Sequence, residues 1–141
     1  MKKRLLYIVL LLLLFTACDK YKNYRLDGMW QLKTVVDVNG NENKVDTVFY
    51  SFQREVMFSV TILENPEFAK FPPFYGYMDM LSDNKIHLVI NNSADESNVA
   101  WFLSLSGWSA ADVTFDIKEY NGKNLVLFDS GNGKTYTFKK F

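Results

Sequence analysis

The chain has 141 residues, which is about the length of one domain. Its 16 basic and 16 acidic residues cancel in charge, so the composition does not indicate a nucleic-acid-binding surface. A single cysteine excludes a disulfide within the chain, and the fold must therefore be held by its core. Hydrophobic residues make up 48% of the sequence, which is enough for such a core.

The first 17 residues are predicted to be an export signal rather than part of the domain. Lys2, Lys3 and Arg4 precede an apolar run at residues 5–15, and small residues precede Cys18. This order is typical of signal peptides. The apolar run is shorter than the roughly 20 residues that a membrane-spanning helix needs, so a one-pass anchor is not expected. Removal of the signal leaves 13 basic against 16 acidic residues, a net charge of −3 that disfavours nucleic acid and anionic membrane surfaces.

Residues 14–18, with the sequence LFTAC, resemble a bacterial lipobox. The resemblance implies that Cys18 is acylated, with palmitate as a typical chain, and becomes the first residue of a mature protein anchored to the outer membrane and exposed to the periplasm. Asp19 resembles an inner-membrane retention signal of some sorting systems, so the inner membrane stays open. The alternative is an ordinary cleaved signal with an incidental cysteine, although an unpaired thiol is unusual in an exported protein.

Residues 18–27 are expected to form the lipidated cysteine and a polar tether, and residues 28–141 a single β domain. Apolar residues alternate with polar residues from Met29 onward, which is the period of a strand. In the first strand this pattern places one set of residues on one face: Trp30, Leu32, Thr34, Val36 and Val38. Asn39 and Gly40 then form a turn that continues as a loop through residue 45.

Eight strands are predicted in all. Because short strands that follow one another with polar turns favour an up-and-down meander, and closure removes exposed edges, the fold class is an eight-stranded antiparallel barrel. The C-terminal run at 134–141 must then pair with the first strand. The strands are expected at residues 28–38, 48–53, 56–62, 74–81, 85–91, 112–120, 124–129 and 134–140.

The connections predict that the two ends of the barrel differ. In a meander alternate connections fall at opposite ends, and the tight turns at 53–55, 82–84 and 121–123 share one end. The other end carries 39–46, the proline-containing segment 64–73, 92–111 and 130–133. The apolar middle of 92–111 should form either a short helix or turn that plugs this elaborated end, which we favour, or an extra strand at 101–105.

Gly28-Met29-Trp30, at the head of this meander, resembles the Gly-x-Trp start of lipocalin and avidin-like barrels. More closely, the chain resembles small lipocalin-like, calycin-type lipoproteins of diderm bacteria. The resemblance is carried by residues 26–32, 50–53, 125–127 and 136–141, after an acylated cysteine. It implies that Trp30 packs across the closed floor of the barrel. The chain lacks the disulfide of typical lipocalins and is shorter, so ligand binding does not carry over directly.

The sequence offers little for catalysis, and we expect a protein that is not an enzyme. His87 is the only histidine and lies on the predicted outer face of its strand. No cysteine besides Cys18 exists to form a nucleophile pair or a metal cluster with it. Asp95 and Glu96, the only adjacent carboxylates, are best explained as solvated loop charges. No cofactor and no metal site are predicted.

Aromatic residues are the main candidates for binding. Large aromatics line the predicted interior, and eight strands leave room either for these side chains alone or for one small ligand. We therefore consider two functions: binding of a small apolar or amphipathic ligand at the elaborated end, or a filled barrel that contacts a protein or glycan through exposed aromatics. The candidate residues are Phe71, Phe74, Tyr75, Trp101, Phe102 and Trp108 at the elaborated end, with Tyr50 and Tyr136 in the interior.

Overall fold

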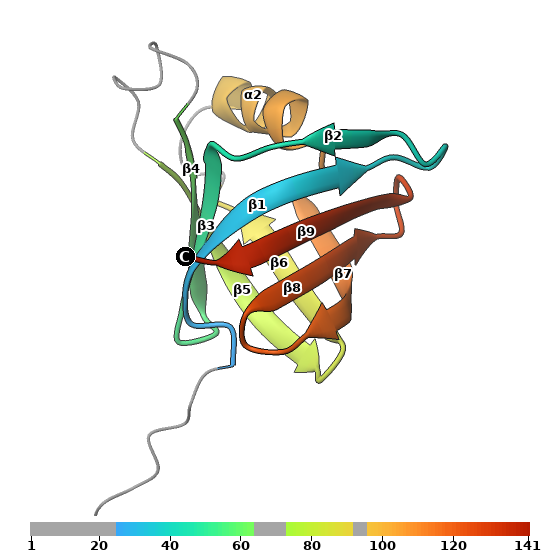
Figure 1. The fold of residues 1–141 in the computed structure, drawn as a ribbon. Coiled ribbons are helices and arrows are strands. Elements are labelled where there is room, and N and C mark those ends of the chain that lie inside the picture. Colours follow the sequence, from blue (N-terminus) through green and yellow to red (C-terminus); the bar gives the residue numbers. More distant parts are fainter. Residues whose placement is uncertain (1–24, 64–72, 92–95) are drawn as a thin grey trace, which may run out of the picture.

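The computed structural model describes residues 25–63, 73–91 and 96–141, which form a closed antiparallel barrel with a helix at one end (Figure 1). The helix is α2 (Glu96–Ser106). Its apolar residues place it against the barrel rather than in solvent. The strands are β1 (Gly28–Val36), β2 (Glu42–Lys44), β3 (Val48–Gln53), β4 (Met57–Ile62), β5 (Phe74–Ser82), β6 (Lys85–Ile90), β7 (Asp112–Tyr120), β8 (Asn124–Asp129) and β9 (Lys134–Lys140).

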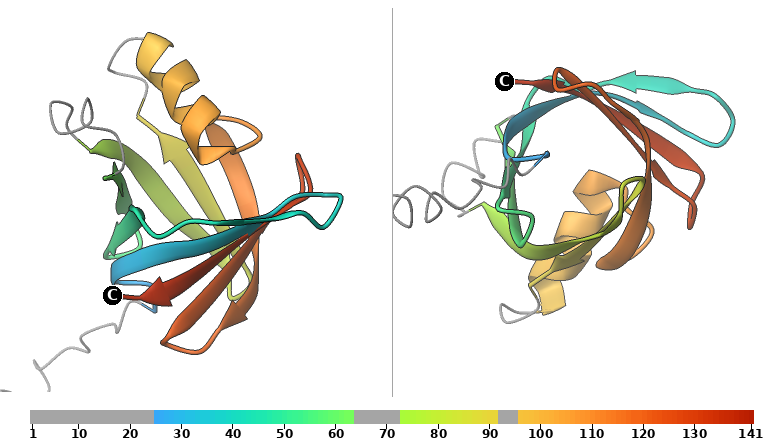
Figure 2. Two further views of the ribbon diagram at one scale, coloured as in Figure 1. Left: turned by 45° about the horizontal axis from the view of Figure 1, so that its top comes forward. Right: turned by 90° about the horizontal axis from the view of Figure 1, so that it is seen from below.

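Pairing of the first and last strands closes the barrel. β1 and β9 run antiparallel, from Trp30 opposite Lys140 to Val36 opposite Thr135. The strands from β3 to β9 each pair with the next in sequence, and β3 pairs with β1. Figure 2 shows the resulting ring of strands end-on. The predicted eight-stranded barrel is confirmed, and closure leaves its eight main strands without a free edge.

The first strand departs from the predicted alternation because it contains a bulge. Leu32 lies opposite Phe138, but Thr34 lies opposite Thr137, so Lys33 is an extra residue. One extra residue reverses which side chains face inward. Val35 accordingly packs against the core. The prediction that Thr34, Val36 and Val38 continue the inner face of Trp30 and Leu32 is therefore wrong.

A short strand, β2, occupies the segment that was predicted to be a loop at residues 41–45. β3 pairs with β1 only from Gly28 to Gln31, which leaves the later part of that edge of β1 unpaired. The chain turns back after Asp37, and Glu42–Lys44 pair with Thr34–Val36. β2 thus extends the wall of the barrel at the elaborated end.

Helix α2 covers the elaborated end, so the predicted plug is confirmed and the alternative strand at 101–105 is wrong. Phe102 is buried, with ring centroids 5.0 Å from Phe74 and 5.0 Å from Trp108. The helix stops because Gly107 adopts a φ of +68°, and its N–H donates to the Leu103 carbonyl at 3.0 Å. A left-handed glycine directly after the last turn is a common helix end.

Trp30 fills the opposite end of the barrel, beside the tight turns. The ring is fully buried, and its Nε1 donates to the Leu26 carbonyl at 2.7 Å. The Lys140 ammonium lies 4.5 Å from the centre of the ring, a cation–π contact, and also donates to the Asp27 carbonyl. The Tyr120 ring packs beside it, with centroids 6.0 Å apart.

A buried carboxylate, Asp129, joins the segment after α2 to the turn between β8 and β9. Its side chain is 0% exposed and accepts hydrogen bonds from the backbone N–H and the hydroxyl of Ser109, both at 2.8 Å. It also accepts one from the Gly131 N–H at 2.9 Å. Charge-assisted hydrogen bonds of this kind are stronger than neutral ones, so Asp129 fixes the connection through which α2 leads into β7.

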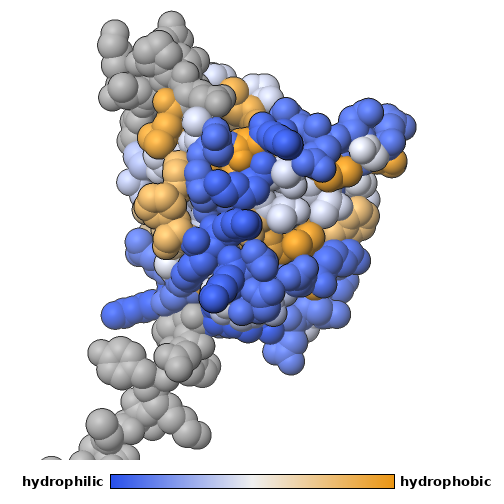
Figure 3. Space-filling view, in the orientation of Figure 1, coloured by the Kyte–Doolittle hydropathy of each residue, from blue (hydrophilic) through white to orange (hydrophobic). Residues whose placement is uncertain are grey.

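The outer surface contrasts with this interior. Figure 3 shows a mostly hydrophilic face over β1, β8 and β9, with small hydrophobic areas between charged side chains. His87 lies on the outer face of β6, as predicted, and its Nε2 is 2.6 Å from Oδ1 of the exposed Asp112. Surface pairs of this kind contribute little to stability.

Replacing Trp30 with alanine should lower the free energy of unfolding by about 3 to 5 kcal/mol, because it empties a filled aromatic site. Urea denaturation measures the change. Met29→Ala is the matched control, since this neighbour is exposed, and should cost less than about 1 kcal/mol. Equal effects at the two positions would show that Trp30 does not seal the floor.

Replacing Asp129 with alanine should cost about 1 to 3 kcal/mol, because the hydrogen bonds that its buried carboxylate accepts from Ser109 and Gly131 would be lost. Thermal or urea unfolding would detect this loss. Asp79→Ala, on the exposed face of β5, should change stability by less than about 0.5 kcal/mol. If the Asp129→Ala variant were as stable as the wild type, the role given to this carboxylate would be contradicted.

Candidate ligand pocket

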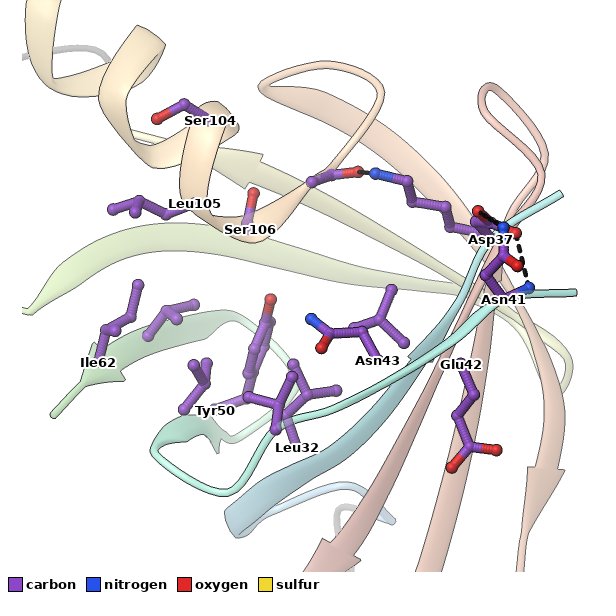
Figure 4. Close-up of a pocket in the computed structure, with 16 residues that line it drawn as sticks. Leu32, Asp37, Asn41, Glu42, Asn43, Tyr50, Ile62, Ser104, Leu105 and Ser106 are labelled. Atoms are coloured by element: carbon purple, nitrogen blue, oxygen red, sulfur yellow. Dashed lines mark hydrogen bonds between the residues drawn. The ribbon is translucent and has the colours of Figure 1, made fainter. Parts of the chain in front are cut away.

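A pocket of about 400 Å³ opens at the elaborated end of the barrel. It lies between the upper parts of β1, β3 and β4, the short strand β2 and the C-terminal turn of α2 (Figure 4). The lining residues are Leu32, Val35, Asp37, Asn41, Glu42, Asn43, Val45, Val48, Tyr50, Val60, Ile62, Ser104, Leu105, Ser106, Gly107 and Lys134.

Seven of the sixteen residues that line the pocket are aliphatic. The strand period turns Leu32, Val48, Val60 and Ile62 toward the inside of the barrel, and Val45 follows β2. The bulge at Lys33 adds Val35, which would otherwise face outward. Leu105 of α2, 43% exposed, faces this wall from the helix. An apolar molecule could therefore bury hydrocarbon on both sides.

The rim beside β2 is polar, and Asp37 brings a carboxylate to it. Asp37 accepts hydrogen bonds from the Asn39 N–H at 2.8 Å, the Asn41 N–H at 2.9 Å and the Asn41 amide at 2.8 Å. These bonds, above all the one from the Asn41 side chain, hold the pKa of Asp37 below its ordinary value. The Asp37 carboxylate therefore holds the turn before β2. Glu42 also borders the pocket, but its carboxylate points away from it (Figure 4).

The carbonyl of Gly107 collects three donors that fix the end of α2 over the pocket. The Tyr136 hydroxyl donates at 2.7 Å, the Asn132 amide at 2.8 Å and the Lys134 ammonium at 3.3 Å. Burial raises the pKa of Tyr136 well above its ordinary value, so its hydroxyl keeps its proton and remains a donor. Lys134, the one cation in the lining, is thus already engaged.

Tyr50 stands at the bottom of the pocket. Its side chain is 1% exposed, and its hydroxyl accepts a hydrogen bond from Trp108 Nε1 at 3.1 Å. Burial raises the pKa of Tyr50 well above its ordinary value, so this hydroxyl is also protonated. Below it the barrel is filled: the rings of Phe138 and Phe52 lie 4.9 and 6.4 Å from that of Tyr50, centroid to centroid.

The structure separates the predicted site residues into several groups. Tyr50 borders the pocket, whereas Tyr136, Phe102 and Trp108 are buried around it. Phe74 and Trp101 are half-buried and contact each other at 5.2 Å between centroids. Tyr75 is 51% exposed on the outer face of β5 and points away from the pocket. Phe71, Cys18, Asp19 and Asp95 lie outside the described residues.

Sequence reasoning missed most of the pocket wall, because it followed aromatic residues. The alternation in β3 and β4 did carry the signal for Val48, Val60 and Ile62, which share the inner face with Tyr50. No comparable signal identified Asn43 or residues 104–107, since neither β2 nor the limits of α2 were predicted. The site is therefore more aliphatic than expected.

The described segments contain neither a cluster of metal ligands nor a membrane-spanning helix. Within residues 25–63, 73–91 and 96–141, no three His, Cys, Asp or Glu side chains gather as metal ligands would. No helix in these segments has the length and apolar character needed to cross a bilayer.

Comparisons with known proteins agree with this architecture. The structure is similar to the crystal structure of a lipocalin-like protein from Bacteroides uniformis ATCC 8492, with 27% identity and a TM-score of 0.67 over 83% of this chain and 99% of that one. It is also similar to the crystal structure of a protein from Bacteroides eggerthii DSM 20697, with 27% identity and a TM-score of 0.66 over 82% of this chain and 99% of that one. A comparison with curated proteins found no match. Residues 13–141 match the family model of the lipocalin-like domain, and the chain therefore belongs to the lipocalin-like domain family.

Proposed function

We propose that this protein is a non-catalytic, lipid-anchored binding protein of the bacterial cell envelope, which holds a small apolar or amphipathic molecule in the pocket at the elaborated end. The observation that carries the proposal is the pocket itself. Its volume of about 400 Å³ falls within the range of small-molecule sites, roughly 300 to 1,000 Å³. Its lining combines aliphatic side chains, which can hold hydrocarbon, with polar side chains such as Tyr50 and Asn43, which can orient a polar atom.

The ligand is expected near the mouth of the barrel rather than in its lower half. Aromatic rings fill that lower half, with Phe52 and Phe58 6.4 Å apart and Trp30 and Tyr120 6.0 Å apart, centroid to centroid. A filled interior keeps the fold rigid without a ligand. The pocket above it stays available for binding.

The proposed anchor would leave the barrel from its floor. Arg25, the first described residue, donates its N–H to Glu55 in the turn between β3 and β4 at 3.1 Å, and its carbonyl accepts from Tyr120 near the turn after β7. Both turns belong to the tight end. An acylated Cys18, seven residues before Arg25, would hold this end toward the membrane. The pocket would then face the aqueous side of the envelope, and the ligand would enter from there.

Ligand binding can be tested with diphenylhexatriene, an apolar hydrocarbon that fluoresces when it leaves water. The unacylated mature chain, residues 18–141 with Cys18→Ala, is suitable because all strands lie within residues 28–140 and related proteins matching 82–83% of this chain fold in crystals. We expect saturable binding. Leu105→Glu should weaken it by about tenfold or more, because the probe would have to desolvate a new charge.

Leu81→Glu is the matched control for this experiment. Leu81 is 54% exposed beside the tight turn between β5 and β6, at the other end of the barrel. The control should bind the probe as the wild type does. Absence of saturable binding to the wild type, or equal loss in both variants, would refute binding in this pocket.

Acylation of Cys18 can be tested separately from ligand binding. Protein purified from the bacterium that naturally produces it should begin at Cys18 and carry acyl chains on that residue, which mass spectrometry would detect. The same protein should fractionate with the outer membrane. Cys18→Ala should abolish fractionation of the protein with the outer membrane, because the acyl chains that hold it there would be missing. Fractionation of the acylated protein with the inner membrane would instead assign retention to Asp19, and an unmodified Cys18 would exclude the anchor.

A further inference from the structure

The hydroxyl of Tyr50 has a proton with no acceptor among the described residues. The indole N–H of Trp108 can only donate, so in the 3.1 Å contact between Nε1 and Oη the tyrosine oxygen must be the acceptor. Tyr136, the other buried tyrosine of the predicted pair, donates its own proton to Gly107 at 2.7 Å. Tyr50 has no such partner in the described segments, although buried hydroxyls normally have one.

The position of this hydroxyl is fixed by the rings around Tyr50. Phe138 packs edge-on against the Tyr50 ring with centroids 4.9 Å apart, and Trp108 lies at 6.2 Å. The ring is 1% exposed, and it borders the pocket. In Figure 4 its hydroxyl points from β3 toward Ser106 at the end of α2. The free proton is thus directed into the pocket.

A second polar group stands near the same place. The amide of Asn43, from β2, lines the pocket and in Figure 4 points toward the Tyr50 side of it. Around both groups lie Leu32, Val48 and Ile62. Besides the hydroxyls of Ser104 and Ser106, the pocket therefore offers a donor held in place by packing and an adaptable amide beside aliphatic side chains, and such polar groups orient a ligand in a small-molecule site.

The charge of the rim indicates what that atom should be. The pocket side chains bring one negative charge, on Asp37, and one positive charge, on Lys134, whose ammonium already donates to Gly107. A carboxylate ligand would lose its hydration here without gaining an unengaged cation, whereas a neutral oxygen has no charge to desolvate. The ordinary source of a neutral acceptor is a carbonyl of a ketone, ester or amide.

We infer that the pocket selects apolar molecules that carry an uncharged carbonyl oxygen, and that Tyr50 is the specificity-determining residue that donates a hydrogen bond to it. This inference rests on the proposed ligand-binding function and names the chemical class of ligand. The hydrocarbon part of such a molecule would lie along Leu32, Val48, Ile62 and Leu105.

The test compares two competitors of equal carbon number, methyl octyl ketone and decane, for displacement of diphenylhexatriene from the unacylated mature chain. Tyr50→Phe removes only the hydroxyl. It should weaken binding of the ketone by about three- to tenfold, the effect of one hydrogen bond, and leave decane and the probe within about twofold. Decanoate should compete less well than the ketone with the wild type.

A second measurement does not depend on folding of the variant. The infrared carbonyl stretch of isotope-labelled ketone bound to the wild type should lie below its value in decane, because a hydrogen bond weakens the C=O bond. An unshifted stretch, equal ketone affinity in Tyr50→Phe, or tighter binding of decanoate would overturn the inference and leave ligand binding intact. Failure of diphenylhexatriene and both competitors to bind the wild type would overturn both.

Discussion

The fold depends on the antiparallel pairing of β1 with β9. It joins Trp30 to Lys140 and Val36 to Thr135, segments about a hundred residues apart, and it converts an open meander into a ring. Loop-closure entropy makes such a long-range contact costly to form, although its cost rises only slowly with length. What offsets the cost is the interior that closure creates, because the aromatic side chains of β1, β3, β4, β7 and β9 meet only when the ring is complete.

Closure also gives the two ends of the barrel different properties. At the tight end, turns as short as Asp83–Asn84 leave no chain to form a site, and Trp30 with Lys140 fills the opening. At the other end longer connections supply β2 and α2, which build walls above the level at which the interior is filled. The pocket exists because these walls rise past the last layer of aromatic side chains, marked by Tyr50 and Trp108.

The sequence was sufficient to predict those properties that follow from a period of two and from turn chemistry. Eight strands, the closed barrel and the contrast between its ends are all of this kind, whereas the place of Trp30 was implied by the Gly-x-Trp resemblance. The bulge at Lys33 could not be predicted, because alternation alone does not show where a strand gains a residue relative to its partner. β2 was missed for a related reason: the sequence of Glu42–Lys44 is polar, and it is a strand only because β1 offers it an unpaired edge. Because the pocket wall uses both features, local sequence patterns could not predict the pocket. They did indicate the aromatic side chains of its floor.

Trp108 connects the position of α2 to the chemistry of the pocket. It follows Gly107 directly, so the three donors that hold the Gly107 carbonyl also set the place of the indole. The indole N–H in turn donates to the Tyr50 oxygen, so the hydroxyl proton stays available for an acceptor in the pocket. The ring of Trp108 meanwhile packs against Phe58, Phe102 and Phe115, with centroids 5.0 to 5.8 Å away, so it cannot turn to release that bond without disturbing the core. The donor character of the pocket floor is therefore a property of the folded barrel as a whole, and a change that moved the end of α2 would alter it without touching a residue of the wall.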